Sequence, residues 1–107
     1  MGKTSREKGK RGEREVAEIL RSHGFPGRRT AQYCGNTGDA SDVVGLDGYH
    51  IEVKRCETIR IMDWLEQAEQ EANGDVPLVV FRKSRGKWYA VLAFEAFLAR
   101  QRPVDTI

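Results

Sequence analysis

The stretch that decides the fold is SDVVGLDGYHIEVK, residues 41–54. It holds an apolar-rich run at residues 42–46 and the beginning of a second run, which continues to residue 56. The pair Asp47-Gly48 separates the two runs. An Asp-Gly pair between two such runs is typical of a two-residue β-hairpin turn, in which both turn residues take positive φ. The stretch therefore predicts two antiparallel strands joined by a tight turn.

A helix and a short strand are predicted before this hairpin. Apolar residues recur at helical spacing in residues 11–23, and Gly24 follows where a helix is expected to stop. Residues 28–33 can form a strand after the turn at residues 24–27.

A second helix, a strand pair and a last short helix are predicted after the hairpin. The second helix ends at Asn73-Gly74, and its apolar stripe consists of Ile61, Leu65, Ala68 and Ala72. Residues 77–82 and 88–92 are predicted strands on either side of a turn, and the last helix carries Phe94, Phe97 and Leu98. The predicted order is helix, three strands, helix, two strands, helix. This is a mixed α/β domain with a central sheet flanked by helices.

The length of 107 residues fits one domain. We expect a flexible basic arm at residues 1–10, a single domain at residues 11–102 and a C-terminal tail at residues 103–107. The thiols of Cys34 and Cys56 lack disulfide or metal-ligand spacing, which predicts a reducing, intracellular and cytoplasmic setting. The longest apolar run has six residues, at positions 76–81, and is too short to cross a membrane.

The net charge of +2 hides an uneven distribution along the chain. Residues 1–34 carry +5, residues 35–80 carry −7, and residues 81–107 carry +4. Basic flanks around an acidic middle suit an enzyme that acts on a polyanion through a metal ion. Some of the acids are expected on the solvated face of the second helix instead, namely Asp63, Glu66, Glu69 and Glu71.

Candidate catalytic residues lie on the hairpin. Side chains alternate along a strand, so Glu52 and Lys54 point to one side, and pairing across the turn brings Asp42 near Glu52. Two carboxylates at a strand end can hold Mg²⁺, with the main-chain carbonyl of Val53 as a further ligand and Lys54 beside the attacking water. The alternative is a solvated hairpin on which Glu52 and Lys54 form a weak surface pair. Asp39 is a competing candidate in the same loop, but Asp42 is preferred because it directly precedes the strand at Val43-Val44.

Glu13 lies on the side of the first helix that the core should cover, close to Val16, Ala17 and Leu20. A buried carboxylate needs a cation, a hydrogen-bond donor or a metal ion nearby. Alternatively, Glu13 complements the helix dipole in the first turn.

The order of these residues resembles the PD-(D/E)XK nuclease superfamily, in particular archaeal-type Holliday junction resolvases and related phage nucleases. The resemblance covers residues 8–92 and rests on Lys8-Gly9, Glu13, Gly24-Phe25, Arg29, Asp42 and Glu52-Val53-Lys54. Ser41 stands where the motif has its proline, the loop at residues 33–41 is long, and the last helix is an addition.

The resemblance implies a restriction-endonuclease-like fold and hydrolysis of DNA phosphodiesters with Mg²⁺ or Mn²⁺. It makes Asp42 and Glu52 metal ligands, Lys54 the catalytic lysine, Glu13 the acid that completes the site, and Arg29 a DNA contact. Gln67 is an auxiliary candidate, with an ordinary helix-surface role as its alternative.

The expected function is that of a DNA endonuclease, with branched DNA as one substrate class and a homodimer as the matching assembly. Cations of both flanks are expected to hold the DNA backbone, namely Lys8, Lys10, Arg11, Arg29, Arg85 and Lys87. The alternatives are a nicking or repair endonuclease, a DNA-binding module without catalysis, and an unrelated toxin or regulator.

Overall fold

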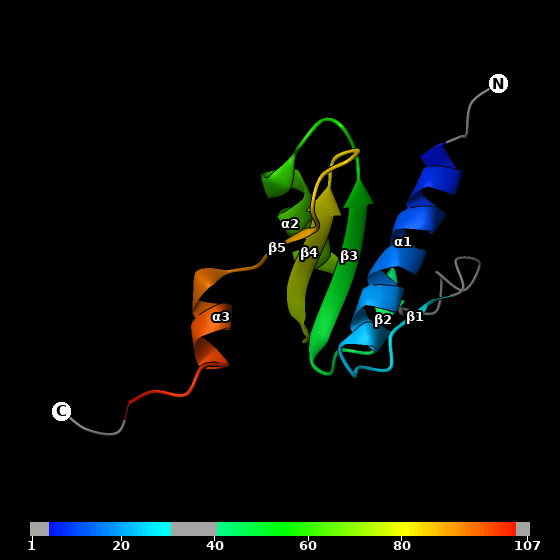
Figure 1. Ribbon diagram of the computed structural model, residues 1–107. Helices are drawn as coiled ribbons and strands as arrows, with labels where there is room; N and C mark the ends of the chain where they lie inside the picture. The colour runs from blue at the N-terminus through cyan, green and yellow to red at the C-terminus, as the bar shows by residue number, and fades with distance from the viewer. Residues whose placement is uncertain (1–4, 31–40, 105–107) are drawn as a thin grey trace.

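The computed structural model describes residues 5–30 and 41–104 (Figure 1). Residues 31–33 of the first predicted strand, Cys34 and Asp39 lie outside these residues. The elements in chain order are α1 (Ser5–Ser22), β1 (Arg28–Arg29), β2 (Val43–Val44), β3 (Tyr49–Arg55), α2 (Ile61–Glu71), β4 (Val76–Arg82), β5 (Tyr89–Val91) and α3 (Phe94–Ala99). This order of helices and strands confirms the predicted one.

The strands form one mixed five-stranded sheet in the order β1-β2-β3-β4-β5. β3 and β4 are parallel, whereas the other neighbouring strands are antiparallel. A parallel pair needs a long crossover connection, and α2 supplies it between β3 and β4. The long, central β3 therefore has a short antiparallel strand on one side and a full-length parallel strand on the other.

The β2–β3 hairpin is confirmed, with Val43 opposite Ile51, but its turn differs from the predicted one. Of the pair Asp47-Gly48, only Gly48 has positive φ, at 83°, and Tyr49 N–H donates to the Leu46 carbonyl over 3.2 Å. Positive φ at the third residue alone is the requirement of a type II turn. Gly45, which directly follows β2, also has positive φ, at 124°. A Cβ there would lie 2.4 Å from the Pro26 carbonyl oxygen, so this position requires glycine.

α1 begins at Ser5, so residues 5–10, which we expected in a flexible arm, form the first turns of the helix. Within these turns Lys8 is exposed and Lys10 is half-exposed, and lysine is a good helix former. The helix ends at Ser22, and Gly24 follows with φ 92°, as its position in the sequence predicted.

Side-chain alternation divides the core into two layers, one on each face of the sheet. Val16 and Ala17 of α1 pack on Ile51 and Val53 of β3. On the other face, α2 contributes Trp64 and Ala68, which pack on Val79 and Phe81 of β4. Glu52 and Lys54, which alternate with Ile51 and Val53, therefore point to the face that α2 covers.

Glu15 ties α1 to the far strands of the sheet. Its carboxylate accepts hydrogen bonds from the Arg82 guanidinium at 3.2 and 3.3 Å and from Trp88 Nε1 at 3.1 Å. Because Arg82 is in β4 and Trp88 directly precedes β5, these bonds fix the position of α1 across β3. They also fix the position of Glu13, one half-turn away on the same helix.

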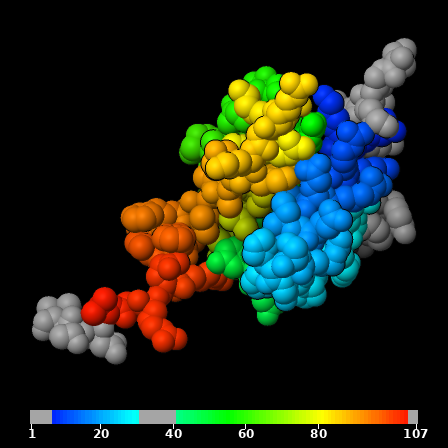
Figure 2. All heavy atoms as spheres, viewed as in Figure 1, coloured from blue at the N-terminus to red at the C-terminus, as the bar shows by residue number. Residues whose placement is uncertain are grey.

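α3 contributes nothing to either core layer, because it has no buried residue. Phe94, Phe97 and Leu98 are 72, 46 and 48% exposed, and Figures 1 and 2 show the helix projecting from the body of the molecule. Arg100 lies over the Tyr49 ring, with 4.8 Å between the guanidinium carbon and the ring centroid. Within the described residues, no helix is both long and apolar enough to span a membrane.

Candidate metal centre and nuclease site

The strand register brings Asp42 and Glu52 together. Val43 lies opposite Ile51, and Asp42, directly before Val43, lies beside the residues of β3 that follow the hairpin turn. The backbone holds Asp42 against β3, because Asp42 N–H donates to the Ile51 carbonyl over 2.9 Å. The Asp42 carboxylate in turn accepts a 2.7 Å hydrogen bond from Val53 N–H. The N–H and C=O of one strand residue point to the same side, so the Val53 carbonyl also faces Asp42.

The electrostatics of Asp42 show that other charged groups lie within range of its carboxylate. Burial and, secondly, the negative charge of Glu52 raise the pKa of Asp42 to about 7, and the charge of Glu13 adds to the rise. The hydrogen bond from Val53 N–H and the positive charge of Lys54 lower the same pKa. Crowded carboxylate oxygens that repel one another, with a main-chain carbonyl alongside, are a donor set that suits a hard divalent cation.

Glu13 is buried on α1, as predicted, and its partner is Arg29 of β1. Arg29 Nε donates to Glu13 Oε1 over 3.0 Å. Within the described residues, Glu13 does not join Asp42 and Glu52 in a cluster whose ligand atoms all lie within 4.8 Å. The partner that the structure gives the buried Glu13 carboxylate is therefore a cation, Arg29. A role for Glu13 at a metal ion stays a prediction.

Lys54 reaches α2. Its Nζ donates to Gln67 Oε1 over 3.4 Å, and its charge acts on Asp42. The amide of Gln67 thus lies beside the predicted catalytic lysine, and its auxiliary role stays a prediction.

A cluster beside Glu52, in which His50 is buried and Glu71 is half-exposed, was missed in the sequence. His50 Nε2 lies 2.7 Å from Glu52 Oε2 and 3.9 Å from Glu71 Oε1, and the ligand atoms of these residues all lie within 4.8 Å of one another. The hydrogen bond with Glu52 raises the pKa of His50, while burial opposes that rise. Burial and then Glu52 raise the pKa of Glu71. The expected solvated face of α2 is confirmed for Asp63, Glu66 and Glu69, which are exposed, whereas Glu71 is half-exposed and also lies beside His50.

Predicted DNA-binding cations lie near one end of the sheet. A hydrogen bond from Ser84 N–H at the β4–β5 turn lowers the pKa of Glu57, and the charges of Arg55 and Lys8 add to this effect. The start of α1, the end of β3 and the tip of the β4–β5 hairpin therefore lie at the same end of the sheet (Figure 1). Exposed cations among those predicted are Lys8, Arg11, Arg85 and Lys87, while Lys10 and Arg29 are half-buried.

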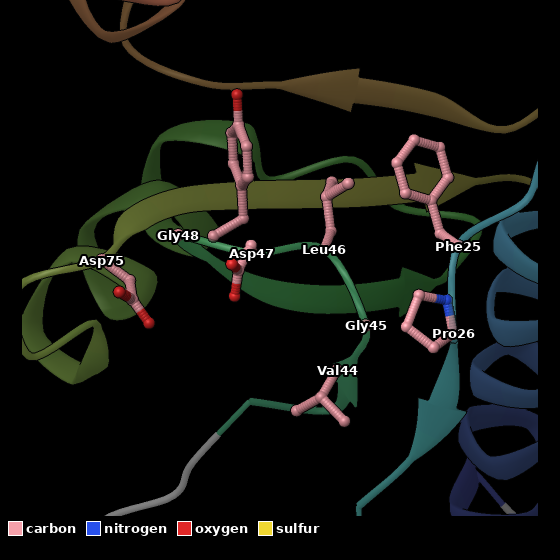
Figure 3. Close-up of a pocket in the computed structure, with 9 residues that line it drawn as sticks. Phe25, Pro26, Val44, Gly45, Leu46, Asp47, Gly48 and Asp75 are labelled. Atoms are coloured by element: carbon pink, nitrogen blue, oxygen red, sulfur yellow. The ribbon is translucent and has the colours of Figure 1, made fainter.

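A separate pocket of about 650 Å³ opens at the β2–β3 connection (Figure 3). Phe25, Pro26 and Leu46 supply much of its apolar lining, and the carboxylates of Asp47 and Asp75 lie at its wall. It lies at the start of β3, whereas Glu52 and Lys54 lie towards the other end of that strand. The predicted site residues are not part of its lining.

Fold and site together define a nuclease of the PD-(D/E)XK class. The chain belongs to the family described as "Phage putative PDDEXK endonuclease", whose model matches residues 4–105. Nucleases of this superfamily generally use divalent metal ions.

The fold is similar to that of Archaeoglobus fulgidus Hjc, a Holliday junction resolvase from an archaeal hyperthermophile. The two chains are 27% identical, the match covers 79% of this chain and 72% of that one, and the TM-score is 0.60. No curated protein matched the sequence. The superfamily and the restriction-endonuclease-like fold expected from the sequence are both confirmed.

Proposed function

We propose that the protein is a Mg²⁺-dependent endodeoxyribonuclease that hydrolyses phosphodiester bonds and accepts Mn²⁺ as a substitute. The carboxylate of Asp42, which accepts a hydrogen bond from Val53 N–H and lies within range of the Glu52 charge, carries this proposal. These groups supply oxygen ligands, and Glu13 lies close enough to act on the charge of Asp42. When bound, the ion would act as a Lewis acid towards the phosphate and increase the acidity of water.

The protein's own residues supply the rest of the chemistry. Lys54, held on β3 beside Gln67, orients the attacking water or takes its proton and offsets the charge of the phosphate. Cations at the ends of α1 and of the β4–β5 hairpin hold the DNA backbone. The Arg29–Glu13 pair connects this DNA-holding function to the acidic site.

A cleavage assay tests this function directly. Purified protein is incubated with linear, nicked and four-way DNA in Mg²⁺, Mn²⁺ or EDTA, alongside Glu52→Gln, Lys54→Ala and a control, Glu66→Gln, which changes an exposed glutamate of α2. We expect metal-dependent cutting that the Glu52 and Lys54 variants abolish while DNA binding persists and the control cuts normally. Binding without cutting in every metal would instead support a non-catalytic DNA-binding module.

We further propose branched DNA as the substrate and a homodimer as the active assembly. The Hjc neighbour is a Holliday junction resolvase, and resolving a junction takes two coordinated cuts, which a symmetric dimer supplies. The exposed Phe94, Phe97 and Leu98 of α3 offer an apolar surface for the second copy. Light scattering after size exclusion should give twice the chain mass, and Phe94→Ser should reduce it. A stable monomer that nicks linear DNA equally well would favour the nicking or repair endonuclease.

A further inference from the structure

A buried chain of hydrogen bonds ends on Glu52. Ser41 Oγ lies 2.8 Å from His50 Nδ1, and His50 Nε2 lies 2.7 Å from Glu52 Oε2. The three residues are 9, 3 and 3% exposed, respectively, so solvent does not compete for these bonds. The proline of the superfamily motif has no hydroxyl group, so only the departure at position 41 makes the first bond possible.

The chemistry of the groups fixes the direction of the second bond. A carboxylate accepts hydrogen bonds, so at 2.7 Å the His50 Nε2 must carry a hydrogen and donate it to Glu52. In the neutral ring, Nδ1 then accepts from the Ser41 hydroxyl; in the charged ring, it donates to Ser41 Oγ. In both protonation states, Ser41 holds the ring and the ring holds one oxygen of Glu52.

We propose that His50, held by Ser41, is a positioning residue that orients the Glu52 carboxylate towards Asp42 for metal binding. This inference rests on the proposed metal-dependent function. Fixing one carboxylate oxygen leaves the other for the ion and removes the rotational freedom that ion binding would otherwise have to restrict. The expected effect is therefore on metal affinity rather than on the chemical step.

The distances argue against His50 as a ligand of a second ion with Glu52 and Glu71. Two ligand atoms that each lie 2.0–2.2 Å from one ion are about 3 Å apart or more in tetrahedral or octahedral geometry. His50 Nε2 and Glu52 Oε2 are closer than this, at hydrogen-bonding distance, while Glu71 Oε1 lies 3.9 Å from Nε2.

Two substitutions at one position separate positioning from packing. The amide nitrogen of His50→Gln can take the place of Nε2 and donate to Glu52, whereas the shorter His50→Asn can reach only the place of Nδ1. Both are polar and similar in size. His23→Gln is the matched control, because His23 is exposed and lies just after α1. Binding of Mn²⁺ is measured by electron paramagnetic resonance without DNA, and cleavage is measured against Mg²⁺ concentration.

We expect His50→Asn to raise the Mn²⁺ dissociation constant and the half-saturating Mg²⁺ concentration by roughly 10- to 100-fold, with the rate at saturating Mg²⁺ retained. His50→Gln should stay near the wild type, and His23→Gln should match it. Ser41→Ala is a milder change and should also raise the Mn²⁺ dissociation constant and the half-saturating Mg²⁺ concentration. It provides the test if His50→Asn does not fold.

Other outcomes overturn the proposal. Equal metal affinity in the Asn and Gln variants would mean that His50 only packs against its neighbours and does not position Glu52. A second Mn²⁺ per chain that His50→Asn removes would make the histidine a ligand. If the wild type cuts no DNA in any metal, the proposed function fails, whereas the Mn²⁺ titrations still decide whether His50 positions Glu52.

Discussion

The substitution Asp42→Asn should stabilise the metal-free protein at neutral and alkaline pH. Burial and the charge of Glu52 raise the pKa of Asp42 from its ordinary value of 3.8 to about 7. At 1.36 kcal/mol per pKa unit, the ionised carboxylate costs the folded state at most about 4 kcal/mol, which Asn removes. Asn also keeps an oxygen that can accept the hydrogen bond from Val53 N–H, so the gain should not be lost to the backbone.

The sign of the pH dependence follows from the raised pKa. Between pH 4 and 7 the folded chain retains a proton on Asp42 that the unfolded chain has released, so wild-type stability falls as the pH rises through this window. The difference between Asp42→Asn and the wild type should therefore be near zero below pH 4 and largest above pH 7. Urea denaturation in EDTA across this range measures it.

Two further measurements make the test strict. Asp63→Asn removes an exposed carboxylate from α2 and should show no such pH-dependent gain. Saturating Mg²⁺ should stabilise the wild type and not Asp42→Asn, because the ion binds the ionised carboxylate. A variant that is less stable than the wild type at pH 8 in EDTA would refute the proposed crowding of charges at Asp42.

Three other predictions concern the surroundings of the site. Arg29→Ala leaves the buried Glu13 carboxylate without its ion pair and should cost about 1–3 kcal/mol in urea denaturation, which Glu13→Gln should partly restore. Deletion of residues 94–107 should abolish the proposed dimer but should cost the folding of the single chain no more than about 1 kcal/mol, because within one chain α3 buries no residue and the contact of Arg100 with Tyr49 is a single cation–π pair. Lys87→Ala should weaken DNA binding and reduce the slope of log affinity against log salt by about 1, as measured by fluorescence anisotropy; an unchanged slope would remove Lys87 from the DNA-binding surface.

The strands and helices could be predicted from local patterns. The Asp47-Gly48 pair and the alternation in β3 located the hairpin, and helical spacing located α1 and α2. The close approach of Gly45 to the Pro26 backbone could not be predicted, because the two residues belong to separate local segments. The start of α1 was also missed, because residues 5–10 have no apolar stripe and their helix propensity alone gives a weak signal.

The site residues that lie on one strand or one hairpin could be predicted. Contacts between residues of different helices and strands were harder to predict. Pairing across the hairpin correctly placed Asp42 near Glu52. His50 shares the alternation of Glu52 and Lys54, so its direction was available from the sequence, although its partner Ser41 was not. Glu71 required knowledge of how the end of α2 packs against β3. Arg29 as the partner of Glu13 depended on the contact between α1 and β1, which no local pattern encodes.

The hydrogen bond from Val53 N–H to Asp42 has a practical consequence for crystallography of DNA complexes. An inactive variant at position 42 that lacks an oxygen acceptor would disturb the β3 backbone along with the acidic site. A variant at position 52 would lose or alter the contact with His50. Lys54 contacts Gln67 over 3.4 Å at a partly exposed position, so Lys54→Ala is the substitution best suited to trapping an uncut substrate in an undistorted protein.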